Sequence, residues 1–290
     1  MREGRASRTA VLVCQGRAVA DGRLAAGRFS DPVAMGLLHA DEREVVERVR
    51  EGQPPEGWSP RVAYEAVRAS AQVCVPRTVA IDDAVRSHHA PQLVILGAGL
   101  DSRAWRMAEL HDVDVYEVDH PASQGDKRSR VAGMTATAGS VTFVPVDLSR
   151  ERLDKALTAA GHLSTVDTTW VWEGVIPYLT KQQVVATMRE IGELSTVGSH
   201  LIVNYQSRST VARVGRLAAR LMALGGGSPW SGEPIRSTWT PPDLAVLMTW
   251  FGFDVITDCD LYGLAQDLAM PIQEAHSLRT GRVAVARAYD

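Results

Sequence analysis

The sequence predicts an α/β fold of the Rossmann-like kind, built on a mostly parallel sheet. Three observations carry this prediction. Residues 92–107, QLVILGAGLDSRAWRM, read as an apolar strand at 93–96, a turn of small residues and a helix at 100–110. Strands and helices then alternate regularly along the chain. Two strand-like runs close the sequence without a helical pattern between them.

Gly97 and Gly99 form the turn of the first unit. Glycine lets the backbone approach a ligand closely, and a following helix offers unpaired N–H groups, so we expect both glycines to line a nucleotide-type site. The third small position of a GxGxxG motif is Ser102, which weakens a dinucleotide interpretation. By itself, such a turn is equally suited to a tight strand-to-helix connection in any α/β protein.

The remaining strands are predicted at 113–118, 141–146, 168–172 and 200–205, with helices at 121–131, 150–160 and 181–194. Connections of this length favour crossover helices and therefore parallel strands. The runs 254–259 and 282–288 are separated by residues 260–281, for which we predict a loop and hence an antiparallel hairpin. Five parallel strands closed in this way give the seven-stranded sheet of the class I methyltransferases, whereas a dinucleotide-binding fold would add a sixth parallel strand.

Residues 1–90 are predicted to form an N-terminal helical cap, and residues 91–290 the core. Within the cap we expect a loosely held arm at 1–28 and helices at 30–38, 41–51, 60–70 and 79–87. Within the core, an insertion at about 207–239 is predicted to form a lid. Its arginine-rich helix at 211–224 suits an anionic ligand, and equally a solvated helix face. Thr240 is expected to cap a helix that runs to residue 250.

Composition narrows the class of partner. The net charge of -3 gives no electrostatic case for nucleic acid, and no apolar run approaches the ~20 residues that span a bilayer. The three cysteines are far apart and form neither a metal-binding pattern nor a disulfide framework, which suits a reducing cytoplasm. We therefore expect a cytoplasmic protein that binds a small molecule, and nothing in the sequence predicts an oligomeric state.

Acidic residues follow three of the predicted strands. Ligands of open α/β sheets bind at the carboxyl ends of the strands. Asp119 could accept both hydrogen bonds of a ribose diol, in a nicotinamide or an adenosyl cofactor. Asp147 could accept from an adenine amino group with Leu148 against the ring, or it could simply cap the next helix. Glu173 could hold a cationic group or pair with an arginine.

Three ordered motifs resemble the leucine carboxyl methyltransferase-like family. They are GAGLDSRAWRM at 97–107, EVDHP at 117–121 with Lys127 downstream, and EGVIPYLT at 173–180. PRTVAIDD at 76–83 extends the resemblance upstream, and FSDP at 29–32 matches loosely. The family contains class I S-adenosylmethionine-dependent methyltransferases, including bacterial enzymes that modify secondary metabolites. The resemblance therefore implies S-adenosylmethionine as the cofactor.

The resemblance also implies roles for individual positions. Arg77 would grip the methionine carboxylate of the cofactor, which suits a guanidinium. Asp101 and Arg103 are expected to pair with each other and hold the turn. The other implied cofactor positions run from the methionine part to the adenine, with Gly97 and Gly99 along the methionine, Asp119 on the ribose, Asp147 and Leu148 at the adenine, and Glu173 near the amino group or the acceptor.

We expect an O-methyltransferase that acts on a small-molecule carboxylate or hydroxyl. A carboxylate is already ionised and needs only orientation, whereas a hydroxyl benefits from a base. Tyr178 and Tyr205, which follow the fourth and fifth strands, are the candidate catalytic residues. Two other interpretations stay open, an NAD(P)-dependent oxidoreductase and a non-catalytic module that binds an adenosyl cofactor.

Overall fold

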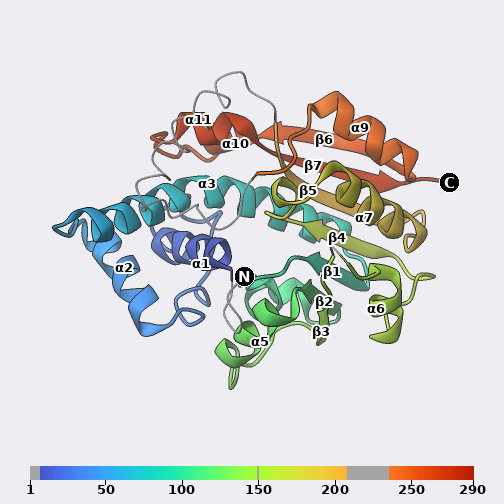
Figure 1. The fold of residues 1–290 in the computed structure, drawn as a ribbon, viewed down its shortest axis with the longest axis horizontal. Helices are drawn as coiled ribbons and strands as arrows, with labels where there is room; N and C mark the ends of the chain where they lie inside the picture. Colours follow the sequence, from blue (N-terminus) through green and yellow to red (C-terminus); the bar gives the residue numbers. More distant parts are fainter. Residues whose placement is uncertain (1–6, 149, 208–234) are drawn as a thin grey trace.

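Seven strands of the described chain form one sheet with helices on both faces (Figure 1). The computed structural model describes residues 7–148, 150–207 and 235–290. The strand order is β3-β2-β1-β4-β5-β7-β6; β1 to β5 are parallel, and β7 runs antiparallel to both of its neighbours. This confirms the predicted topology. The strands are β1 (Gln92–Leu96), β2 (Asp114–Asp119), β3 (Ser140–Pro145), β4 (Thr168–Trp172), β5 (His200–Gln206), β6 (Phe253–Asp260) and β7 (Gly281–Ala288).

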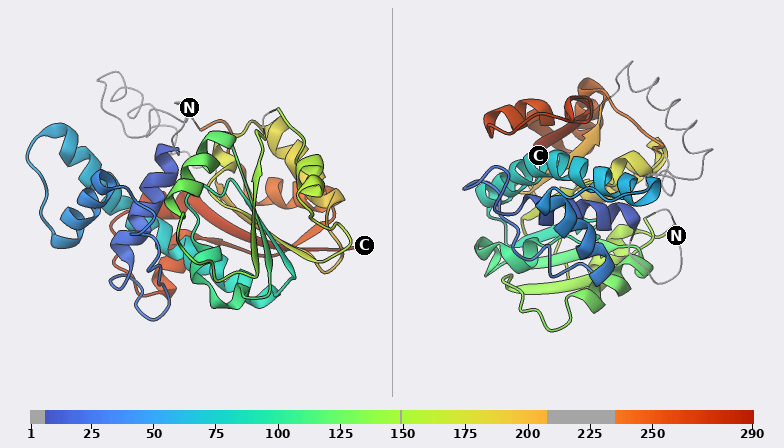
Figure 2. Two further views of the ribbon diagram at one scale, coloured as in Figure 1. Left: turned by 90° about the horizontal axis from the view of Figure 1, so that it is seen from below. Right: turned by 90° about the vertical axis from the view of Figure 1, so that its left-hand side faces the viewer.

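Each face of the sheet has its own apolar core. Every residue of β1 and β4 is buried, as expected for central strands covered on both sides. Alternate residues serve opposite cores, with Leu93 and Ile95 in one and Val94 and Leu96 in the other. The first core is covered by α1 (Arg8–Ala20), α3 (Trp58–His88) and α10 (Leu261–Asp267), and the second by α6 (Leu153–Ala159), α7 (Lys181–Glu193) and α9 (Pro241–Trp250), as Figure 2 shows from two sides.

The N-terminal residues are more ordered than predicted. The expected loose arm contains α1, and residues 14–20 are all buried. The helix packs closely on α3 because Gly16 has no side chain. A Cβ added there would lie 2.9 Å from the backbone N of Ala71. After α1, residues 30–38 form turns, not the predicted helix, while α2 (Ala40–Glu51) matches its prediction.

One helix, α3, replaces the two helices predicted at 60–70 and 79–87. It contains Pro76, which lacks an N–H and normally ends a helix. Most of its residues from Ala71 to Val85 are buried, so packing against α1 and the sheet outweighs the local cost. α3 leads directly into β1, and it therefore carries Arg77 and Asp82 past the sheet.

Most core elements match their predictions within a few residues, including α5 (Pro121–Arg130), α6, α7 and α9. Thr240 caps α9 as expected, since its hydroxyl accepts from Asp243 N at 3.2 Å. Two predictions were wrong. The helix expected at 100–110 is a single turn, α4 (Arg103–Arg106), followed by η1 (Ala108–Leu110), and the loop expected at 260–281 holds α10 and α11 (Ala275–Thr280).

The predicted lid at about 207–239 lies largely outside the described residues, and so does its helix at 211–224. Its described end is anchored at η2 (Ile176–Tyr178), where the backbone N of Arg236 donates to Pro177 O at 2.7 Å. No helix in the described part of the chain is long and apolar enough to cross a bilayer.

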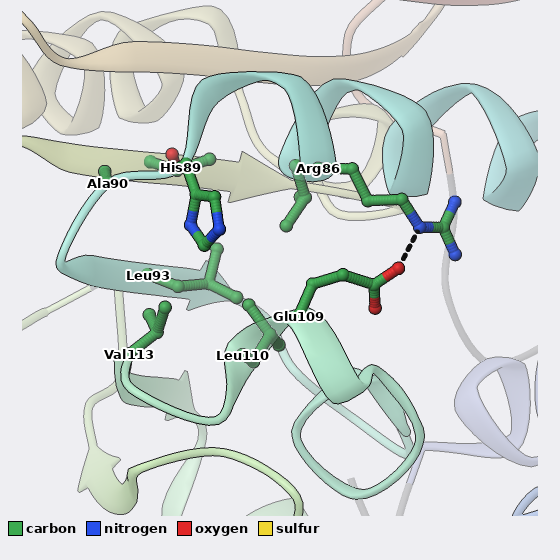
Figure 3. A pocket seen from close by; sticks show the side chains of 9 residues that line it. Arg86, His89, Ala90, Leu93, Glu109, Leu110 and Val113 are labelled. Atoms are coloured by element: carbon green, nitrogen blue, oxygen red, sulfur yellow. Dashed lines mark hydrogen bonds and ion pairs between the residues drawn. The ribbon is translucent and has the colours of Figure 1, made fainter.

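The edge of the sheet opposite the glycine turn holds a small cavity between the end of α3 and β1 (Figure 3). Its volume is about 10 Å³, and Arg86 and Glu109 close one side through an ion pair of 2.7 Å. A cavity of this size holds about one water molecule. It is too small for a cofactor.

His162 makes the fold sensitive to acid. Its Nε2 lies 3.0 Å from Thr168 Oγ1, and burial lowers the pKa of the imidazole from 6.5 to about 4. The unfolded chain therefore takes up a proton first as the pH falls, and stability is lost between pH 6.5 and 4. We predict that His162→Gln reduces the loss of unfolding free energy between pH 7 and 5 by about 1 to 2 kcal/mol relative to the unmodified chain, measured by urea denaturation. Equal losses in both proteins would contradict this prediction.

Candidate cofactor site

The glycine turn lies where β1 meets the ends of β2 and β4. Gly97 N donates to Val118 O at 2.7 Å, and Gly97 has φ of 68°, in the left-handed region that favours glycine. A Cβ on Gly97 would lie 2.1 Å from Val175 Cγ2. The turn that follows β4 is therefore packed directly against the turn that follows β1.

Asp119, at the end of β2, holds the second half of the turn. Its Oδ2 accepts from Gly99 N at 2.5 Å, and its Oδ1 accepts from His120 N at 2.6 Å. Burial raises the pKa of this carboxyl above its ordinary value, although both N–H donors and the nearby Lys127 oppose the shift. Each carboxylate oxygen keeps a lone pair for a further donor. Asp119 is thus placed at the turn, as the sequence predicted.

Arg77 and Glu173 meet beside the glycine turn. Arg77 Nε lies 2.6 Å from Glu173 Oε1, and Glu173 Oε2 lies 3.0 Å from Arg103 Nη1. All three side chains are largely buried. Burial alone would raise the pKa of Glu173, but the Arg77 and Arg103 guanidiniums lower it overall. The site therefore presents a cation and an anion side by side.

A larger set of buried charges holds this pair in place. Arg103 binds Asp101, as expected, and also Asp82 on α3 with Nε–Oδ1 at 2.8 Å. Burial opposes ionisation of Asp101, yet Arg103 and other nearby cations lower its pKa to about 2. Arg106 reaches the same Asp82, with Nη1–Oδ2 at 2.7 Å. α3 is thereby joined to α4 at the start of the core.

The N-terminal cap reaches the turn through Ser102. Its hydroxyl donates to Asp31 Oδ2 at 2.6 Å and accepts from Arg106 Nε at 3.0 Å. Arg17 of α1 donates to the same Asp31 oxygen at 2.8 Å and to Leu100 O at 2.6 Å. Ser102, which occupies the third glycine position of the dinucleotide motif, therefore connects Asp31 of the N-terminal cap to the glycine turn.

Asp147 and Leu148 follow β3, beside the end of β2. The backbone N of Val146 donates to Asp119 O at 2.8 Å, which brings the ends of the two strands together. Asp147 and Leu148 are half-buried. Asp147 N donates to Glu151 Oε2 at 2.8 Å, and its carboxylate lies 3.7 Å from Arg150 Nε.

The two tyrosines have different surroundings. Tyr178 is half-buried in η2, directly after the Glu173 turn. Tyr205 is fully buried, donates to Asp258 Oδ2 at 2.6 Å and accepts from Arg282 Nε at 3.1 Å. Burial and Asp258 raise the pKa of Tyr205 well above its ordinary value, so the phenolate that could act as a base is scarcely formed at neutral pH.

Comparison with known proteins bears on the family of this chain. The sequence profile of the leucine carboxyl methyltransferase family matches residues 10–192. The chain belongs to the leucine carboxyl methyltransferase family. A protein of Streptomyces coelicolor, provisionally named an S-adenosyl-L-methionine-dependent methyltransferase, is 37% identical over 163 residues, 55% of this chain and 56% of that protein. A Frankia alni protein with the same provisional name is 35% identical over 193 residues, 64% of each chain.

The matched regions thus span 56% and 64% of these relatives' own lengths. Both relatives are named for S-adenosyl-L-methionine, which is the cofactor predicted for this chain from its sequence. The fold also matches a solved structure, the magnesium protoporphyrin IX methyltransferase of Synechocystis with bound S-adenosylhomocysteine. That structure has a TM-score of 0.51 and 15% identity, and the match covers 86% of this chain and 95% of the other.

Sequence reasoning missed several residues that shape the site of this family member. Arg17 lies in the segment predicted to be loose, and Asp82 lies within PRTVAIDD, a motif quoted without a role for this residue. Lys127 and Glu117 form a fully buried ion pair with Nζ–Oε2 at 2.5 Å, and burial raises the pKa of Glu117 to about 7 despite the lysine. Both residues belong to the motif EVDHP with Lys127 downstream, which was quoted without an ion pair between them.

The Gly97–Val175 contact can be tested by a double-mutant cycle. Gly97→Ala introduces a clash with a stiff β-branched side chain together with backbone strain, so we expect it to lower the unfolding free energy by about 2 to 4 kcal/mol. In a Val175→Ala background only the strain of about 1 to 2 kcal/mol should persist. Urea denaturation of the four proteins measures both costs, and equal costs in the two backgrounds would show that the contact is unimportant.

Proposed function

We propose that this chain is an S-adenosylmethionine-dependent O-methyltransferase that acts on a small-molecule carboxylate or hydroxyl, as in bacterial secondary metabolism. The observation that carries the proposal is the placement of the Arg77–Glu173 pair and the Asp119 carboxylate on either side of one glycine turn. The Arg77–Glu173 pair is complementary to the carboxylate and ammonium groups of an amino acid. The Asp119 carboxylate can accept hydrogen bonds from a ribose diol. The free buried thiols of Cys14 and Cys74 favour the cytoplasm as its location.

The residues fit the cofactor in charge and in hydrogen-bonding capacity. Arg77 Nε is buried and, although close to Glu173, makes no hydrogen bond of normal geometry. A carboxylate is the ligand that satisfies a guanidinium best. Arg77 would bind the methionine carboxylate, Glu173 the amino group, and Asp119 the ribose, with Gly97 and Gly99 along the chain between them. Asp147 and Leu148 would frame the adenine.

When bound, S-adenosylmethionine supplies the methyl group from its sulfonium centre. The chain's own contribution is to hold the acceptor oxygen in line with that centre and to exclude water. An acceptor carboxylate is ionised at neutral pH and needs no base. Of the two tyrosines we propose Tyr178 as the acceptor-side residue, because the Tyr205 hydroxyl is held between Asp258 and Arg282.

The two other interpretations of the sequence are less well supported. The antiparallel β7 stands where a dinucleotide-binding fold would carry a parallel strand, and Ser102 occupies the third glycine position. A module that binds the cofactor without catalysis would keep the same cofactor residues, so an acceptor assay has to distinguish it. A radiolabelled methyl donor and a panel of carboxylates and phenols serve this purpose, since a base-labile product is an ester and a base-stable one is an ether.

Calorimetric titration with S-adenosylhomocysteine, with NADH in parallel, tests the cofactor. We predict micromolar binding of S-adenosylhomocysteine and none of NADH. Asp119→Asn keeps an oxygen for one of the two backbone N–H donors and removes the charge and the second acceptor, so it should weaken binding at least tenfold. Glu47→Ala, which removes an exposed carboxylate from α2, is the control and should bind like the unmodified chain. Binding of NADH alone would refute the proposal.

A further inference from the structure

Helix α1 lies directly on the glycine turn, although a loosely held arm was predicted there. A Cβ built on Gly99, whose φ is 47°, would lie 2.9 Å from the Cβ of Ala10 and 3.9 Å from its Cα. The first half of α1 is therefore in close contact with the glycine turn, at the residue whose backbone N donates to Asp119. Figure 1 shows α1 beside α3, near the end of β1 that leads into the turn.

The position of α1 is fixed by buried contacts on two sides. Arg17 donates to Leu100 O at 2.6 Å and to Asp31 Oδ2 at 2.8 Å, which ties the helix to the residue after the turn. On the α3 side, Ser70 Oγ donates to Leu12 O at 3.1 Å, and Gly16 allows the two helices to touch. α1 cannot shift as a whole without breaking these contacts.

The exposed pattern of α1 indicates a further occupant beside it. Residues 10–13, AVLV, are apolar in succession, and all four side chains are only partly buried while packed on the core. Of these four residues, Ala10 is the one that lies against Gly99, and its side chain is partly exposed beside the turn, where the cofactor of the proposed function would lie.

From these contacts we propose that α1 forms the outer wall of the cofactor pocket and that Ala10 is a cofactor-contacting residue whose small size sets the available room. The inference rests on the proposed function, because it takes the cofactor to lie along the Gly97–Gly99 turn. A side chain larger than alanine at residue 10 would extend into the space beside the Gly97–Gly99 turn. The ribose and methionine portions of the cofactor need that space. Alanine is therefore a requirement of binding at this position.

The test compares two substitutions that add a leucine to the same helix. Ala10→Leu should weaken S-adenosylhomocysteine binding at least tenfold in calorimetry, and a thermal melt checks that the variant is folded, because the added bulk against the turn also lowers stability. Arg8→Leu, at an exposed position two residues earlier, should bind normally. Equal affinities in the two variants overturn the inference but leave the proposed function intact. No binding by the unmodified chain overturns both.

Hydrogen exchange gives a second readout that does not depend on a variant folding correctly. In the unmodified chain, saturating S-adenosylhomocysteine should slow exchange of the backbone amides of residues 10–13 at least severalfold. The amides of α2, which does not approach the turn, serve as the internal control. Slowing at the glycine turn without any change in α1 would overturn the inference.

Discussion

Buried opposite charges, equal in number, hold the site of this protein together. Four arginines and four carboxylates connect α1, the turn after Phe29, α3, the glycine turn and the end of β4; they are Arg17, Arg77, Arg103, Arg106, Asp31, Asp82, Asp101 and Glu173. Removing one partner from a buried pair costs about 3 to 5 kcal/mol, because the other charge stays uncompensated. This constraint fixes the cap on the sheet and makes both parts one structural unit.

We propose that the same balance prepares the site for a zwitterion. Arg103 is shared by Asp82, Asp101 and Glu173, so Glu173 remains paired when Arg77 turns to another carboxylate. A ligand that brings its own carboxylate and ammonium group can exchange with the Arg77–Glu173 pair without leaving a charge unpaired. The ion pair is a structural contact, and in the proposed function it is also the receptor for an amino-acid head group.

The sequence was most informative where the local pattern and the tertiary structure agree. The strands, the glycine turn and the final antiparallel strand were predictable because β1 and β4 carry apolar runs that are buried, and because the connections between the parallel strands are long enough for crossover helices. The cap was not, since α1 is held by the distant partners Asp31 and Leu100, and Pro76 gives a local signal that packing overrides. Asp119 and Glu173 were found from their places after strands, whereas Arg17 and Asp82 have no such signal.

The most direct test of this account is a crystal structure of the chain with S-adenosylhomocysteine. The account predicts that the homocysteine carboxylate lies on the Arg77 guanidinium, that Glu173 stays on Arg103 and faces the amino group, and that the ribose hydroxyls lie on Asp119. A complex in which Arg77 and Glu173 remain paired with each other, and the carboxylate binds elsewhere, would contradict it.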